Sequence, residues 1–248
     1  MNRFLALFLL GLALIPHAVF AQSRATGTGF DLTATNGIRY IADAGRYEAS
    51  GDVQLVVGAW VVLADQVVAV LDGPQDQIDS LTATGTVFVQ NESFKARADA
   101  LELRLSDPLV TLRGEAISVQ MGDERLMTQR RLTYAVKDGT LTIPQAFVLQ
   151  VDGAVIAGGE AALVLADGGM QALHVDAGVD IERDDFRAAA EQMDYAPIDA
   201  KIVLSGAVVL QSGDVLLSGA SAVFDLKTGA VQISNDTSQR VSGALLPQ

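Results

Sequence analysis

The chain of 248 residues carries 30 acidic and 17 basic side chains, two histidines and no cysteine. Its formal net charge of −13 makes nucleic acids and anionic membrane surfaces unfavourable partners, because like charges repel at a distance. With no cysteine and so little histidine, the composition also disfavours a zinc site or a catalytic triad. We therefore expect no metal, no cofactor and no nucleic acid.

Residues 1–21 have the layout of a cleavable secretory signal peptide. Arg3 precedes an apolar run from Phe4 to Ile15, and Pro16 and small residues lead to Ala21. The run is shorter than the ~20 apolar residues that a membrane-spanning helix needs. We expect cleavage after Ala21 and export; an uncleaved membrane anchor is the alternative. The remainder has a formal net charge of −14, from 16 basic and 30 acidic residues.

The rest of the chain repeats one β unit with a period close to 31 residues. The clearest copy spans 206–229: a glycine, a strand, a Gly-Asp turn, a strand, a small residue, a strand and a Thr-Gly turn. Four places after the reference position of each copy the residue is small in six of the seven copies. The reference positions are Asp31, Trp60, Phe94, Arg125, Val155, Phe186 and Val215. Such a period indicates β units that bury a shared core by stacking.

In chain order, residues 22–30 are polar and Gly-rich and are expected to form a flexible leader. The first copy, 31–41, is partial and suits the edge of the array. Residues 94–105 alternate between apolar and charged side chains, as in a strand with one buried face. Residues 170–175 and 186–195 have some helical propensity, but both keep the register of the repeat and are predicted as strands. We expect a single all-β domain over 31–248 with about seven repeat units.

Polar clusters in the chain have simple explanations. Arg125, Arg130 and Arg131 crowd the least regular copy, which suits either an exposed turn or a basic spot for phosphate groups. His174 occupies a strand position and is expected to be exposed. The acidic pairs at 123–124 and 184–185 fall at turns, where solvation explains them better than acid–base catalysis. A carbohydrate lyase would need acidic ligands and basic residues stacked on one face, so binding or scaffolding is favoured over catalysis.

Several short motifs recur along the chain: A-S-G-D-V-Q-L at Ala49–Leu55, V-L-A-D at Val62–Asp65, A-T-G-T-V-F-V at Ala83–Val89, A-R-A-D at Ala96–Asp99 and L-S-G-A-V-V-L at Leu204–Leu210. These motifs resemble those of the LptA/OstA-like family of periplasmic lipopolysaccharide transport proteins, and the resemblance extends over about residues 31–245.

The resemblance implies an elongated antiparallel β-jellyroll in the periplasm whose apolar interior receives the acyl chains of lipid A. It also implies head-to-tail homo-oligomers, and docking to LptC-like and LptD-like partners, through edge strands; Asp31–Ile41 and Val231–Leu246 are the candidates. From the alternation, the candidate lining residues are Leu55, Trp60, Val89, Phe94, Leu103, Tyr134, Ile181, Phe186, Tyr195, Leu210 and Phe224. The same pattern fits a structural β-solenoid with a packed core that self-assembles, and the sequence leaves both open.

Overall fold

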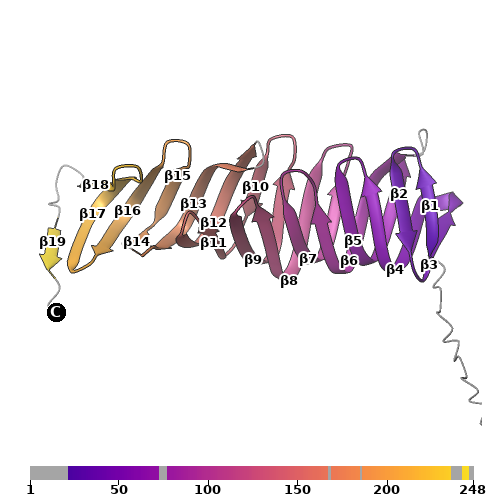
Figure 1. Ribbon diagram of the computed structural model, residues 1–248, viewed down its shortest axis with the longest axis horizontal. Helices are drawn as coiled ribbons and strands as arrows, with labels where there is room; N and C mark the ends of the chain where they lie inside the picture. The colour runs from indigo at the N-terminus through magenta and orange to yellow at the C-terminus, as the bar shows by residue number, and fades with distance from the viewer. Residues whose placement is uncertain (1–21, 73–76, 167–168, 185, 236–241, 246–248) are drawn as a thin grey trace, which may run out of the picture.

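The structure, a computed structural model, describes residues 22–72, 77–166, 169–184, 186–235 and 242–245 (Figure 1). The expected signal peptide lies outside the described residues. The described part is almost entirely β-strand, as the sequence predicted, with a single 3-10 turn, η1 (Ala42–Ala44). It contains no helix that is long and apolar enough to cross a membrane.

The strands follow one another along the chain with short turns between them. Their bounds are β1 Ser23–Gly27, β2 Phe30–Ala34, β3 Gly37–Ile41, β4 Arg46–Val57, β5 Trp60–Asp72, β6 Gln77–Gln90, β7 Lys95–Arg104, β8 Leu109–Met121, β9 Glu124–Ala135, β10 Thr140–Ile143, β11 Phe147–Val151, β12 Ala154–Ala166, β13 Gly169–Glu182, β14 Arg187–Ala190, β15 Gln192–Ala196, β16 Lys201–Ser212, β17 Val215–Asp225, β18 Ala230–Ser234 and β19 Ser242–Leu245.

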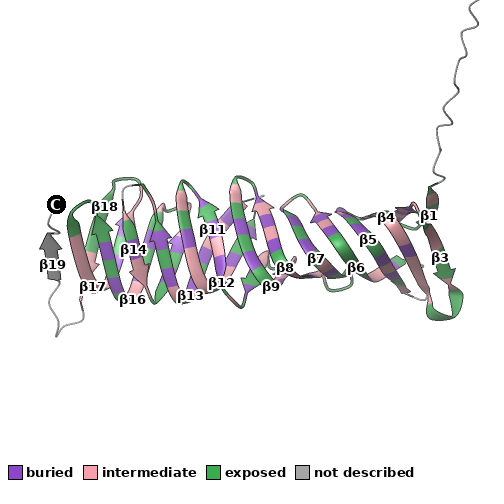
Figure 2. Cartoon of the chain, turned by 90° about the horizontal axis from the view of Figure 1, so that it is seen from below, coloured by how far each residue is buried: buried purple, intermediate pink, exposed green. Residues whose placement is uncertain are grey.

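All strands belong to one antiparallel sheet in which each pass of the chain pairs with the pass before it and the pass after it. The result is an elongated stack with the N-terminal strands at one end and the C-terminal strands at the other (Figure 1). Buried residues alternate with more exposed ones along the long strands (Figure 2), as expected for a sheet with one face turned to a core.

The sheet folds over along its length into two facing halves. β4 pairs with β2 through its C-terminal part and with β3 through its N-terminal part, and the other long strands divide in the same way. We call half A the side that contains β2, β11, β14 and β19, and half B the side that contains β3, β10, β15 and β18. The inward side chains of both halves form one hydrophobic cluster, so the folded sheet encloses a single interior.

The fold-over line consists of β-bulges held by an acidic side chain on one strand and a glycine on the next. Between Leu63/Gln66 and Thr84/Val87 the register of β5 and β6 shifts. Asp65 Oδ2 accepts a hydrogen bond from the backbone N–H of Thr86 at 3.0 Å, and Gly85 beside it has φ +97°. A Cβ at Gly85 would lie 2.1 Å from Asp65 Oδ2, so only glycine fits there.

The next bend repeats this arrangement. Asp99 Oδ2 accepts from the backbone N–H of Glu115 at 2.8 Å, next to the register shift between Gly114 and Ile117. Asp65 and Asp99 are the last residues of the V-L-A-D and A-R-A-D motifs. The acidic residue of these motifs is therefore explained by the bend that it stabilises.

The expected flexible leader contains a strand. β1 pairs along its whole length with β2, and Arg24 forms an ion pair with Asp31 at 2.6 Å. Apolar alternation is absent from this segment, because β1 is a polar edge strand held mainly by backbone pairing. Residues 22–30 are thus largely part of the sheet.

The repeat pattern was correct in period and partly wrong in register. Trp60 and Val215 begin strands and Phe94 directly precedes one, as the repeat required. Val155, however, lies on the outer face and is 38% exposed, while Ile156 is buried. Arg125 also faces outward. Asp31 also faces outward, between the buried Phe30 and Leu32. A shift of one residue moves a side chain to the other face of a strand, so the repeat template was one residue out of register in these three copies.

Candidate functional site

The interior of the folded sheet contains the predicted lining residues. Ten of the eleven are buried, and Phe186 is partly buried and packs against the same cluster. Leu55, Val89 and Leu103 have no accessible surface at all. A side chain with no accessible surface has no water-sized void beside it, so side chains fill the interior at these positions.

The predicted residues separate into two groups. The aliphatic ones, Leu55, Val89, Leu103, Ile181 and Leu210, lie on the inward face of their strands, and three of them, Val89, Leu103 and Ile181, are also the penultimate residues of theirs. The aromatic ones lie at strand ends, beside the turns on the side opposite the bends. We call the turns that join strands of half A rim A and those that join strands of half B rim B. The aromatic residues are therefore at the opening between the two rims.

Aromatic side chains from the two rims meet across this opening. Phe94, next to rim A, packs edge-on against Tyr134, next to rim B, with ring centroids 5.0 Å apart. Phe186 and Phe224, also from opposite rims, are stacked nearly parallel with ring centroids 5.0 Å apart. Phe30 and Tyr47 form a third pair at 5.5 Å near the N-terminal end. We call these three cross-rim pairs, together with the hydrogen bond between Tyr195 and Asp152 that is described next, the aromatic seam.

The fourth contact of the seam is a hydrogen bond. Tyr195, the penultimate residue of β15 in half B, donates its hydroxyl to Asp152 Oδ2 in the β11–β12 turn of rim A at 2.9 Å. Burial raises the pKa of the Tyr195 phenol far above its usual value, and the bond to Asp152 raises it further. The phenol therefore remains a hydrogen-bond donor throughout the neutral and mildly alkaline range.

The two sides of the interior differ in how strongly they are joined. At the bends the backbone is continuous from half A to half B in each long strand. At the rims, backbone hydrogen bonds between described residues run along each rim, such as Leu105 N to Asp79 O on rim B, and not from rim to rim. Side chains alone hold the seam shut. The seam therefore lacks the backbone continuity that joins the two halves at the bends.

Sequence reasoning missed three seam residues, the aromatic Phe30 and Tyr47 and the hydrogen-bond acceptor Asp152. Phe30 fell in the expected leader, and Tyr47 precedes the glycine that opens the next copy. The two aromatic residues could have been found from their position in the sequence, because each lies within two residues of a turn and has its side chain on the inward register. Trp60 belongs with the seam, because its ring contacts Phe94 at 5.8 Å along rim A.

The polar residues singled out from the sequence do not form a catalytic centre. Arg125 lies on the outer face of half A, Arg130 at the bend and Arg131 on half B; the segment is a strand and not a turn. His174 is exposed, as expected, and contacts Asp194 at 2.7 Å and Asp176 at 3.0 Å. Within the described residues no group of three or more metal-ligating side chains is placed to hold a metal ion.

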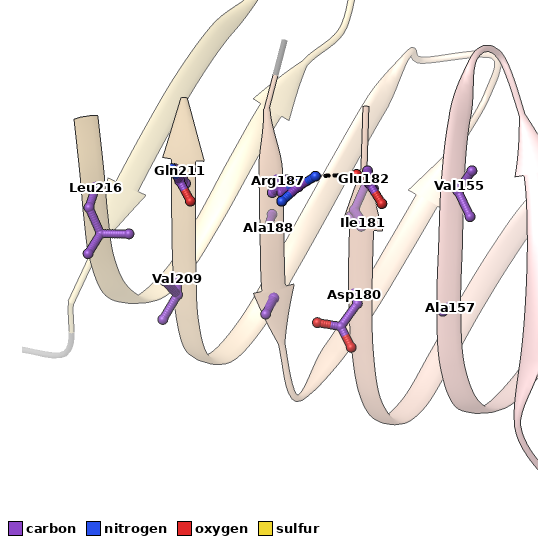
Figure 3. A pocket seen from close by; sticks show the side chains of 11 residues that line it. Val155, Ala157, Asp180, Ile181, Glu182, Arg187, Ala188, Val209, Gln211 and Leu216 are labelled. Atoms are coloured by element: carbon purple, nitrogen blue, oxygen red, sulfur yellow. Dashed lines mark hydrogen bonds and ion pairs between the residues drawn. The ribbon is translucent and has the colours of Figure 1, made fainter. Parts of the chain in front are cut away.

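The outer face also has hollows. One of about 390 Å³ crosses β12, β13, β14, β16 and β17 on half A (Figure 3). Val155, Val209 and Leu216 give it apolar walls, and an ion pair between Arg187 and Glu182 at 2.5 Å crosses its floor. Since these side chains face away from the interior, this hollow is separate from the seam.

Residues 36–140 match the sequence profile of the family described as LptA/(LptD N-terminal domain) LPS transport protein. This segment spans β3 to the start of β10. No curated protein sequence matches the chain.

Among solved structures, one match is the crystal structure of LptH, the LptA-homologous periplasmic component of the lipopolysaccharide transport device of Pseudomonas aeruginosa. It is 12% identical, with a TM-score of 0.23, over 88% of this chain and 95% of that one. The resemblance to the family rests on the profile match and not on this likeness. The profile match confirms, over residues 36–140, the resemblance to the LptA/OstA-like family that the sequence motifs indicated.

Proposed function

We propose that the protein is a non-enzymatic periplasmic carrier for lipopolysaccharide, and that its interior takes the acyl chains of lipid A when the aromatic seam opens. Two observations together support this most directly. Residues 36–140 match the family, and the apolar interior is continuous and is closed on one side by side chains alone.

The energetics of acyl transfer favour such an interior. Each CH₂ group that leaves a membrane for water costs ~0.8 kcal/mol, so a bare acyl chain cannot cross an aqueous gap. Aromatic pairs contribute about 0.5–1.5 kcal/mol each beyond their buried area. The free energy needed to open one or two seam contacts is therefore small beside the free energy gained by burying several acyl chains. Inward aliphatic residues such as Leu103 then replace their contacts with one another by contacts with lipid.

A structural role is the second candidate, and the packing favours it. Leu55, Val89 and Leu103 leave no void beside them, which is what a self-assembling β-solenoid requires. The two roles differ in whether the seam ever opens.

Photo-crosslinking in the cell envelope separates the two roles. A photoreactive phenylalanine derivative replaces Phe94, Tyr134 or Tyr195 in turn, with Lys201 on the outer face of half B as the matched control position. The carrier role predicts lipopolysaccharide adducts at the three seam positions and none at Lys201. Folded, exported protein without adducts at any seam position would instead establish the packed solenoid.

We further propose that the stack docks end to end with further copies, and with LptC-like and LptD-like partners, through its terminal strands. Among the described residues β3 pairs only with β4 in half B, and β18 pairs only with β17. Val231 and Ile233 of β18 lie on the inward register opposite Phe224 and Ala222, yet Val231 is 41% exposed. Unpaired edge strands with uncovered apolar side chains are suited to strand addition.

Charge at this edge should prevent association. The double substitution Val231→Lys and Ile233→Lys is expected to abolish self-association in light scattering, because it places charge where the next core would continue. Gln232→Lys, on the outward register of the same strand, is the matched control and should associate normally. Equal association of both variants would show that β18 is not a docking edge.

A further inference from the structure

The outer face of half A carries a basic strip that the interior does not explain. In one row of directly opposed residues across five strands, Gln90, Lys95, Gln120, Arg125 and Gln150 follow one another. In the neighbouring row the order is Leu63, Phe88, Arg97, Ser118, Met127 and Val148. The two rows thus hold three cations and no acid. We call Lys95, Arg97 and Arg125 the basic strip.

The strip contrasts with the rest of the molecule. The whole chain has a formal net charge of −13. Within the described part of the chain, none of the three cations lies at ion-pair distance from a carboxylate, whereas Arg113 on half B is paired with Glu102. Asp99, two residues after Arg97 on β7, accepts a hydrogen bond from the backbone N–H of Glu115 at the bend.

A hollow of about 450 Å³ lies over the strip. Its walls include all three cations, and its amide and hydroxyl groups come from Gln120 and Ser118. The Arg97 guanidinium lies 6.0 Å from the centre of the Phe88 ring, which holds the charge close to the surface. Cations beside uncharged hydrogen-bond donors form a surface suited to phosphate, which accepts several hydrogen bonds at once.

The strip lies beside the opening of the interior. Lys95 follows the seam residue Phe94 directly, and Arg125 is the second residue of β9 after the turn of rim A. An amphiphile whose acyl chains enter through the seam must leave its polar head in water outside one rim. The row of Lys95 and Arg125 is one residue from rim A and within reach of such a head.

We propose that the basic strip binds the phosphate groups of the amphiphile whose acyl chains enter the seam. This inference rests on the proposed carrier function and adds a headgroup site to it. The strip fixes the head on rim A, so that the lipid enters in one orientation and not with its head against the acidic side chains elsewhere.

The test compares two lipids and two triple variants. Lipid A with both phosphates and enzymatically dephosphorylated lipid A are titrated against the full exported chain. The first variant carries Lys95→Gln, Arg97→Gln and Arg125→Gln. The control variant carries Arg104→Gln, Arg131→Gln and Lys201→Gln, three exposed positions outside the basic strip, and has the same net charge. Circular dichroism checks that both fold.

We expect the natural protein to bind phosphorylated lipid A at least about tenfold more tightly than the dephosphorylated form, since three partly exposed charge contacts together give about that factor. The strip variant should lose this preference and keep its affinity for dephosphorylated lipid, while the control variant keeps the preference.

A preference that survives in the strip variant, or that both variants lose equally, would overturn the proposal and leave the carrier function standing. Natural protein that binds neither lipid would overturn the carrier function itself, and the headgroup site with it.

Discussion

The stretches β4–β9 and β10–β19 build the same folded sheet in different ways. In the first, every strand runs unbroken through the bend, and Asp65 and Asp99 tie the bends of β5 and β7 to the following strand. In the second, three passes are split in two, giving β10/β11, β14/β15 and β18/β19. The fold thus depends on alternation and neighbour pairing, while the Asp-Gly bend is one of several ways to turn the chain.

The two ends of the stack differ as well. At the N-terminal end the inward residues Phe30 and Leu32 are 6% and 0% exposed. At the C-terminal end Val215 and Val231 are 40% and 41% exposed, although both lie on the inward register. The N-terminal end of the stack therefore has a more complete core than the C-terminal end, and the following predictions compare the two stretches from the largest expected effect to the smallest.

Equivalent seam residues should differ in their contribution to stability. Phe94 is 2% exposed and contacts two other rings, so Phe94→Ala should lower the free energy of unfolding by about 3–5 kcal/mol. Phe186 is only partly buried, so Phe186→Ala should cost roughly half as much. Urea unfolding followed by circular dichroism measures both. Equal losses would show that the two stretches are packed alike.

The regular bends should be sensitive to their acidic residue. Asp99→Ala removes the acceptor of the Glu115 N–H and should cost about 1 kcal/mol, the usual worth of such a hydrogen bond. Asp194→Ala, a change of the same type on the outer face of half B, contacts no bend and serves as the control at pH 8. A stable Asp99→Ala variant would mean that the glycine alone shapes the bend.

A single substitution at a bend of the second stretch should increase the stability of the protein. Ala207 has φ +47°, in the left-handed region that a Cβ disfavours, and lies in the register shift of β16. Ala207→Gly is expected to raise the free energy of unfolding by about 0.5–1 kcal/mol. Ala172→Gly, at a β-strand position without positive φ, should lower it instead. Thermal unfolding of the pair gives the sign, and a loss in Ala207→Gly would contradict strain at this bend.

The smallest effect concerns pH. On half B, β13 and β15 are linked through His174, whose hydrogen bond to Asp194 raises its pKa, as does that to Asp176. Because the folded pKa exceeds the ordinary value near 6.5, the contribution is complete below about pH 6.5 and is lost as the pH rises through the folded pKa. Because His174, Asp176 and Asp194 are largely exposed, we expect these contacts to contribute less than about 1 kcal/mol to the free energy of unfolding.

His174→Gln should flatten the stability profile between about pH 6 and 8. The regular stretch has the Arg113–Glu102 pair in place of a histidine, and Arg113→Gln should leave the shape of that profile unchanged. Stability that falls over this pH range in the His174 variant as in the natural protein would assign the dependence to another group.

Alternation and turn residues were enough to predict an all-β stack, its period and its buried side chains. They place Leu103 inside and Lys95 outside with no knowledge of the fold. They could not show that Phe94 and Tyr134 meet, because those residues are 40 positions apart and come together only when the sheet folds over. Nor could they collect Lys95, Arg97 and Arg125 on one face. The irregular bulges also shifted the register at Val155.

The pairing of each pass with its immediate neighbours makes the length of the molecule a property of repeat number. Adjacent strands lie about 4.8 Å apart, so each further two-pass unit would extend the stack by roughly 10 Å and leave its cross-section unchanged. A globular domain grows in every direction when residues are added, but this chain can grow in one only. The number of repeats encoded in the gene can therefore set the distance that such a molecule spans across a compartment.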